Sequence, residues 1–79
     1  MMPNNEKVYI MNNFKVMETQ GSNDTRETIT ISAKSLSHAK TTASRGQAFR
    51  DTWLHIENEQ GYHLARKNPH TGKWENTPA

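Results

Sequence analysis

Cysteine is absent from this sequence of 79 residues. That absence excludes a disulfide framework and a thiolate metal site, two common ways of stabilising a small fold. Long apolar runs are absent too: no stretch approaches the roughly 20 residues of a membrane-spanning helix, and the N-terminus lacks the apolar segment of a signal peptide. We therefore expect a cytoplasmic protein with no membrane contact.

Apolar residues are scarce overall, at 32% of the sequence with a mean hydropathy of -1.01. A chain of this length buries only about 60% of the surface that its unfolded form exposes, so the core must be thin. Two Trp, two Tyr and two Phe make such a core feasible. We expect a flexible tail at residues 1–6, a single α+β domain at 7–76 and a flexible end at 77–79.

Alternating apolar residues predict two strands before residue 34. The residues concerned are Val8, Ile10, Phe14 and Val16 within 7–18, then Ile29, Ile31 and Ala33 within 27–33. Strict alternation is typical of strands that bury one face. The polar cluster at 20–24 lies between the two stretches, so they are predicted to form a hairpin.

One short helix is predicted after the first hairpin. Ser35 is a suitable N-cap, and Leu36, Ala39 and Ala43 then recur at helical spacing up to Gly46. The outward side of this helix is basic and rich in hydroxyl groups, with His38, Thr41 and Arg45 pointing away and Lys40 on the flank.

The remaining chain predicts a second hairpin and a brief last strand. Leu54 and Ile56 alternate with Trp53 and His55, a turn follows at 59–61, and strands are expected at 62–67 and 73–75. The predicted fold is therefore α+β, with an antiparallel sheet of about five strands packed on a single helix in the order β-β-α-β-β-β. Trp74 and Tyr62 are expected to support the core, whereas Trp53 either is exposed or covers the second face of the sheet.

Charge is distributed unevenly along the chain although the net charge is only +2. Residues 1–33 carry a balance of -1 and residues 34–79 a balance of +3, and the segment from Lys34 to Arg50 has four cations and no acid. A local basic surface of this kind suits an acidic partner or nucleic acid, with a solvated face as the plain alternative.

Sequence features of catalysis and cofactor binding are not found. Two imidazoles, His55 and His63, face one another across the predicted second hairpin, but two such ligands without a third make no recognisable metal site. There is no cysteine nucleophile, Gly-rich phosphate loop or convincing carboxylate pair. We expect a binding protein that is not an enzyme and that uses neither metal nor cofactor.

Scattered identities give the chain a resemblance to a known family. They are strongest from Ala33 to Lys73. They form the runs 33–40 and 43–49, continue at Thr52, Ile56, Glu57, Gly61, Leu64 and Ala65, and end at 72–74. With these residues the chain resembles the type I-F anti-CRISPR protein nine family of phage-encoded inhibitors. The resemblance covers about residues 11 to 75 and implies an antiparallel sheet around one helix. It also implies binding to backbone subunits of a type I CRISPR-Cas (Csy) surveillance complex in the bacterial host cell, a block of target-DNA hybridisation, and capture of duplex DNA by the inhibited complex.

Several positions match the surfaces that this family uses. By resemblance, Lys40, Arg45 and Gln47 would contact the backbone subunit, whereas Thr41 departs from the pattern by standing where the family has a basic residue. Lys67 and Lys73 match its basic surface on the late hairpin, and Arg66 adds a further cation beside them. The free chain is expected to be a monomer.

Two other classes of function stay open at the level of sequence. A small phage or plasmid accessory protein would bind nucleic acid directly through the basic surface and aromatic residues, with a steep salt dependence. A module within a homo-oligomer would instead pair through an exposed edge strand.

Overall fold

The computed structural model describes residues 11–21 and 24–78. The expected tail at 1–6 and the first two apolar residues of the predicted first strand, Val8 and Ile10, lie outside the described residues.

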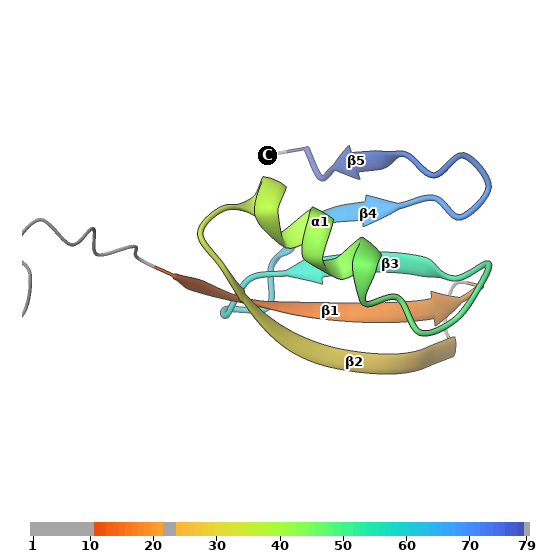
Figure 1. Ribbon diagram of the computed structural model, residues 1–79, viewed down its shortest axis with the longest axis horizontal. Helices are drawn as coiled ribbons and strands as arrows, with labels where there is room; N and C mark the ends of the chain where they lie inside the picture. The colour runs from red at the N-terminus through yellow and green to blue at the C-terminus, as the bar shows by residue number, and fades with distance from the viewer. Residues whose placement is uncertain (1–10, 22–23, 79) are drawn as a thin grey trace, which may run out of the picture.

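The described chain forms a five-stranded sheet with one helix on it (Figure 1). The elements are β1 (Asn12–Gln20), β2 (Asp24–Ala33), α1 (Leu36–Arg45), β3 (Trp53–Glu57), β4 (His63–Lys67) and β5 (Trp74–Asn76). Every neighbouring pair is antiparallel, and the strand order is β2-β1-β3-β4-β5. The predicted α+β fold and its element order are confirmed.

The core lies between α1 and one face of the sheet. It consists of Phe14, Val16, Ala33, Ala39, Ala43, Leu54 and Ile56, all buried. The strand residues among them come from the alternating positions that the sequence predicted. Because the helix contributes two alanines, its backbone can approach the sheet closely, and a thin apolar layer is enough to fill the gap.

Both ends of α1 are capped as the sequence predicted. The Ser35 hydroxyl accepts a hydrogen bond from the backbone N–H of His38 at 3.2 Å, which satisfies one of the free donors of the first turn. At the other end the N–H of Gly46 donates to the carbonyl of Thr42 at 3.0 Å.

Of the two aromatic residues assigned to the core, one is placed correctly. Trp74 packs against the core cluster, whereas Tyr62 is 69% exposed, so its assignment was wrong. The reason is an irregular register: Ile56 pairs with Ala65 but Glu57 pairs with His63, so Leu64 has no partner residue on β3. This bulge turns Leu64 toward the core beside Ala65 and leaves Tyr62 in the connecting turn.

The second face of the sheet carries polar and aromatic side chains, and no described helix or strand packs over it. Register places Met17 and Thr19 of β1 beside His55 and Trp53 of β3 on this face. We call it the open face. The single described helix has ten residues, and nothing in the described chain is a helix long and apolar enough to cross a membrane.

Candidate functional site

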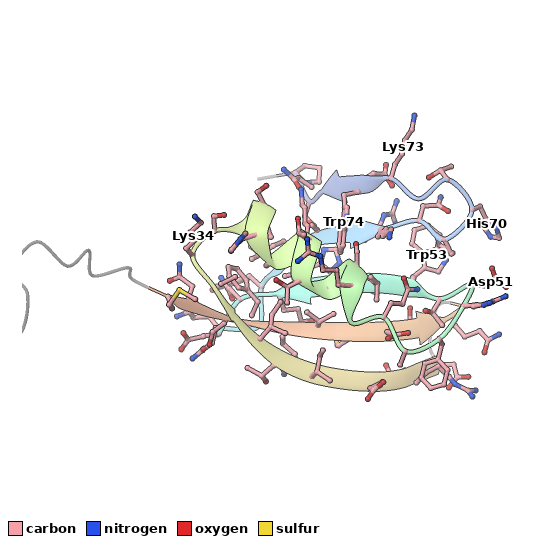
Figure 2. All side chains as sticks on the ribbon, viewed as in Figure 1. Lys34, Asp51, Trp53, His70, Lys73 and Trp74 are labelled. Carbon is pink, nitrogen blue, oxygen red and sulfur yellow. The ribbon has the colours of Figure 1, made fainter. Side chains whose placement is uncertain are left out.

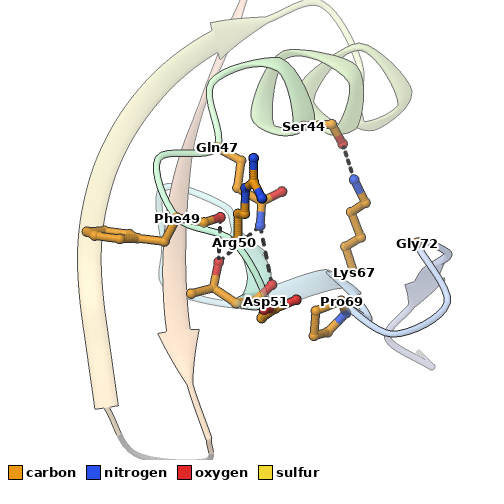
Figure 3. A pocket seen from close by; sticks show the side chains of 9 residues that line it. Ser44, Gln47, Phe49, Arg50, Asp51, Lys67, Pro69 and Gly72 are labelled. Carbon is orange, nitrogen blue, oxygen red and sulfur yellow. Dashed lines mark hydrogen bonds between the residues drawn. The ribbon is translucent and has the colours of Figure 1, made fainter.

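A polar hollow of about 450 Å³ lies where three segments meet: the end of α1, the loop at 46–52 and the turn between β4 and β5 (Figure 3). Its polar lining includes Ser44 and Gln47 from the first two segments and Lys67 from the end of β4, with Arg50 on the loop. We call this hollow the basic pocket. The three connections are exposed, so a large partner has access to it.

Three cations in this part of the chain have side chains that are free to meet a partner. Arg50 lines the pocket, and Arg45 and Lys73 each follow a lining residue in the sequence. Within the described chain, all three side chains are exposed and have no hydrogen bond or ion pair. Asp51 is the acidic residue of the lining and holds a left-handed backbone with φ 59°. Since cations outnumber acids here, the pocket attracts anionic groups.

Lys67 joins the sheet to the helix inside the pocket. Its ammonium group donates to the Ser44 hydroxyl at 3.2 Å (Figure 3). Register places Lys67 opposite Leu54, so its side chain lies on the helix side of the sheet. It therefore belongs with Arg50 rather than with the open face.

Arg66 lies on the other side of the sheet, opposite His55. It forms an exposed ion pair with Glu75 at 3.4 Å, and its guanidinium carbon lies 5.2 Å from the centre of the Trp53 ring. The sequence grouped Arg66 with Lys67 and Lys73, but successive strand residues point to opposite faces. The structure does not bring these three cations onto one surface.

The three residues matched to the partner surface also have different settings. Lys40 donates to the Asn76 side chain, and Gln47 is half-buried and donates to the Thr52 hydroxyl at 3.0 Å. Only Arg45 points outward with no partner among the described residues. The Gln47 side chain is therefore occupied in holding the loop, whereas the Arg45 side chain is free to contact another molecule.

Glu18 anchors the loop of the basic pocket, a role that the sequence analysis missed. Its side chain is buried, at 5% relative exposure for the residue. One carboxylate oxygen accepts from the N–H of Ala48; the other accepts from the N–H of Phe49 at 3.0 Å and the hydroxyl of Thr52 at 2.9 Å. Because hydrogen bonds to a carboxylate are strong, one residue of β1 fixes the course of 48–52.

Phe49 fixes the outer flank of the same loop. Its ring points away from the basic pocket toward β2 (Figure 3), where the Arg26 guanidinium carbon lies 5.4 Å from the ring centre. Such a contact between a cation and an aromatic face is weakly stabilising at an exposed site. The loop is thus held on one side by a carboxylate and on the other by an arginine.

Imidazoles and hydroxyls form a hydrogen-bonded chain on the open face. Thr19 Oγ1 lies 3.2 Å from His55 Nε2, His55 Nδ1 lies 2.9 Å from His63 Nε2, and His63 Nδ1 contacts the hydroxyl of Thr77. When both rings are neutral, each has one N–H donor and one acceptor nitrogen, so every contact in the chain can be a hydrogen bond. When both are charged, the N–H at His55 Nδ1 would point at the N–H at His63 Nε2. Thr77, which the sequence placed in a flexible end, also donates its N–H to the Leu64 carbonyl at 2.8 Å.

Burial lowers the pKa of His55, and the neighbouring His63 and Arg66 lower it further, against an opposing effect of Glu57. The folded chain thus binds a proton at His55 less readily than the unfolded chain, in which the pKa of this residue is 6.5. We expect the contribution of His55 to the free energy of unfolding to be complete above pH 6.5 and lost as the pH falls from there through the lowered folded pKa.

Chemical denaturation at pH 7.5 and pH 5.5 measures this effect. The control is His55→Gln, which keeps a hydrogen-bonding side chain but cannot titrate, so its loss of stability on acidification should be smaller than that of the natural sequence. Equal losses in both proteins would contradict the assignment to His55.

Groups of three or more His, Asp or Glu side chains placed to hold a metal ion are not found in residues 11–21 and 24–78. The imidazole pair described above therefore has hydroxyl groups, and not a third metal ligand, as its nearest partners.

The chain matches no protein-family model and no curated protein sequence. Among solved structures it is similar to AcrIF9, with 34% sequence identity and a TM-score of 0.77. The similarity covers 89% of this chain and 91% of that one, and so includes most of the sheet and helix described above.

Proposed function

This chain belongs to the AcrIF9 family of type I-F anti-CRISPR proteins, and on that premise we propose that it is a non-enzymatic inhibitor of the type I-F CRISPR surveillance complex. It binds the backbone subunits of that complex and prevents the guide from hybridising with target DNA. The observation that carries this proposal is Arg45 at the end of α1, whose exposed side chain has no hydrogen bond or ion pair within the described residues, on a scaffold shared with AcrIF9.

The inhibition needs no chemical step. A groove that holds nucleic acid presents polar and charged groups, and a protein that fills it must satisfy them. Arg45 offers five donors at the end of a capped helix. Because the cap holds the backbone of this helix in place, the conformational freedom lost on binding is confined to the Arg45 side chain.

Duplex DNA is a second partner that depends on the first. The basic pocket offers Arg50 and Lys67, and Lys73 follows its lining residue Gly72. These cations are enough for about three phosphates, whereas strong binders make 6 to 10 such contacts. The free chain therefore binds duplex weakly. When it is held beside the positively charged channel of a surveillance complex, the same contacts add to an existing basic surface and capture duplex without sequence preference.

Arg45→Ala tests the contact with the complex. We expect the affinity for purified type I-F surveillance complex to fall by about tenfold or more, as for an interface anchor, while the stability changes by no more than about 0.5 kcal/mol. The matched control is Lys15→Ala, which removes an exposed cation from β1 and should bind like the natural sequence.

The affinities are compared by titrating the immobilised complex with each variant. Equal affinity of the Arg45 variant and the natural chain would remove this residue from the interface. Failure of the natural chain to bind the complex at all would remove the proposed function itself.

A further inference from the structure

A second hollow, of about 460 Å³, lies on the open face of the sheet, on the opposite side from α1. It is lined by Gly21, Trp53, His55 and Arg66. We call it the aromatic hollow. Neither the resemblance to AcrIF9 nor the proposed function assigns a role to it.

Flat groups form the walls of the aromatic hollow. The rings of Trp53 and His55 are 22° from parallel with their centres 6.5 Å apart, and the Arg66 guanidinium lies 5.2 Å from the Trp53 ring centre. Arg66 stands over one face of the Trp53 ring, and each of the three side chains is partly exposed, so a flat ligand can enter the hollow that they line.

The walls are also held in position by neighbouring side chains. Hydrogen-bond contacts with Thr19 and His63 orient the His55 ring, and the ion pair with Glu75 restrains Arg66. A site whose side chains are already ordered loses little freedom when a ligand binds.

Gly21 lines the hollow just after the end of β1. It has φ +71°, a conformation that side-chain-bearing residues rarely adopt, and it places no side chain over the hollow. Among the described residues no carboxylate lines the hollow, but the Glu75 carboxylate is paired with Arg66, so Arg66 shares its charge between Glu75 and an anionic ligand.

The aromatic hollow and the basic pocket lie toward the same end of the molecule. Figure 2 shows Trp53 at the end where Asp51 and His70 lie. Trp53 follows directly on Thr52, which lines the basic pocket. Because successive strand residues point to opposite faces, a polymer with phosphates at the basic pocket has to bend around this end of the sheet to reach the hollow.

We propose that the aromatic hollow binds an unpaired base of single-stranded nucleic acid, stacked on Trp53 and His55, with Arg66 beside it. Stacking on aromatic side chains tolerates any base because every base has a π-face. Bases in a duplex stack on one another and cannot enter, so the hollow selects single strands. This property belongs to the free chain and does not rest on the proposed inhibition of a surveillance complex.

The test uses the free, full chain and a 12-nucleotide oligothymidylate, with a duplex of the same length as comparison. Tryptophan fluorescence should be quenched to saturation by the single strand, with duplex at least about tenfold weaker. Because both Trp53 variants lack the reporting tryptophan, their affinities are compared with the natural chain by the fluorescence anisotropy of a dye-labelled oligothymidylate. Trp53→Thr should weaken binding by about tenfold or more, and Trp53→Phe, which keeps a ring, by much less. Lys15→Gln, which removes a cation from the open face of β1 without changing the hollow, should bind like the natural chain and shows that general charge does not carry the binding.

Three results would overturn the proposal: no quenching by the single strand, equal affinity for duplex, or full affinity of Trp53→Thr. If Trp53→Thr does not fold, as judged by circular dichroism, the proposal is tested on the natural chain instead, by NMR measurement of its amide chemical shifts with and without oligothymidylate. Shifts on adding oligothymidylate that centre on β3 and β4 at Trp53, His55 and Arg66 support it. Shifts confined to the basic pocket show an electrostatic contact alone and contradict it.

Discussion

Glu18→Ala is expected to lower the free energy of unfolding by about 2–3 kcal/mol, because it removes a buried acceptor of three hydrogen bonds. The donors left behind belong to Ala48, Phe49 and Thr52, so the loop at 46–52 loses its attachment to β1. A small domain has a total stability of only about 5 kcal/mol or somewhat more, which makes this a large fraction. Urea denaturation measures the change, and amide exchange of 48–52 locates it.

The matched control is Glu27→Ala, since Glu27 lies directly opposite Glu18 in the register of β2 and is exposed. It should change the stability by no more than about 0.5 kcal/mol. Glu18→Gln should have an intermediate effect on the free energy of unfolding. Its amide keeps one accepting oxygen, but its NH2 group is a donor and faces a loop donor that a carboxylate oxygen accepted from in the natural chain. A Glu18→Ala protein as stable as the natural chain, with unchanged exchange at 48–52, would contradict the assigned role.

The second large effect concerns capture of duplex DNA by the inhibited complex. We expect the surveillance complex with this protein bound to retard non-target duplex in a gel far more than either component alone. Arg50→Ala combined with Lys67→Gln and Lys73→Ala should abolish most of that gain while the protein stays bound. Gln at position 67 can still hydrogen-bond Ser44, so the variant tests charge and not packing.

Arg66→Gln is the matched control for duplex capture, because Arg66 lies on the opposite face and is already paired with Glu75. It should leave the gain in duplex binding almost unchanged. Strong retardation by the free protein at near-physiological salt would favour the alternative of direct nucleic-acid binding. An unchanged gain in the triple variant would show that the basic pocket does not contact the duplex.

Most of the fold could be predicted because it depends on local periodicity. Alternation at Phe14, Val16, Leu54 and Ile56 places each strand's core face, and the caps of α1 follow from residue types at its two ends. The wrong assignment of Tyr62 arises from the bulge at Leu64, which changes the register of β4. A bulge depends on how two strands meet and leaves no clear mark in the sequence of one.

The candidate site was predictable only in part. The excess of cations between residues 34 and 50 correctly indicates the helix end as basic, yet the contacts of Gln47 depend on Thr52, whose orientation depends on Glu18. Glu18 does carry a signal, because it continues the apolar phase of Phe14 and Val16. A buried carboxylate is costly unless hydrogen-bond donors surround it, so an acid at a core position predicts such donors. The sequence alone does not say which segment supplies them.

The central claim is that this chain prevents the guide of a type I-F surveillance complex from hybridising with its target. The most direct measurement follows formation of the RNA–DNA hybrid on a labelled target duplex, using permanganate reactivity of the displaced strand, with and without saturating protein. The proposal predicts that the displaced strand stays unreactive when the protein is added before the target, and that Arg45→Ala restores reactivity at limiting protein concentrations. Full reactivity of the displaced strand at saturating natural protein would contradict it.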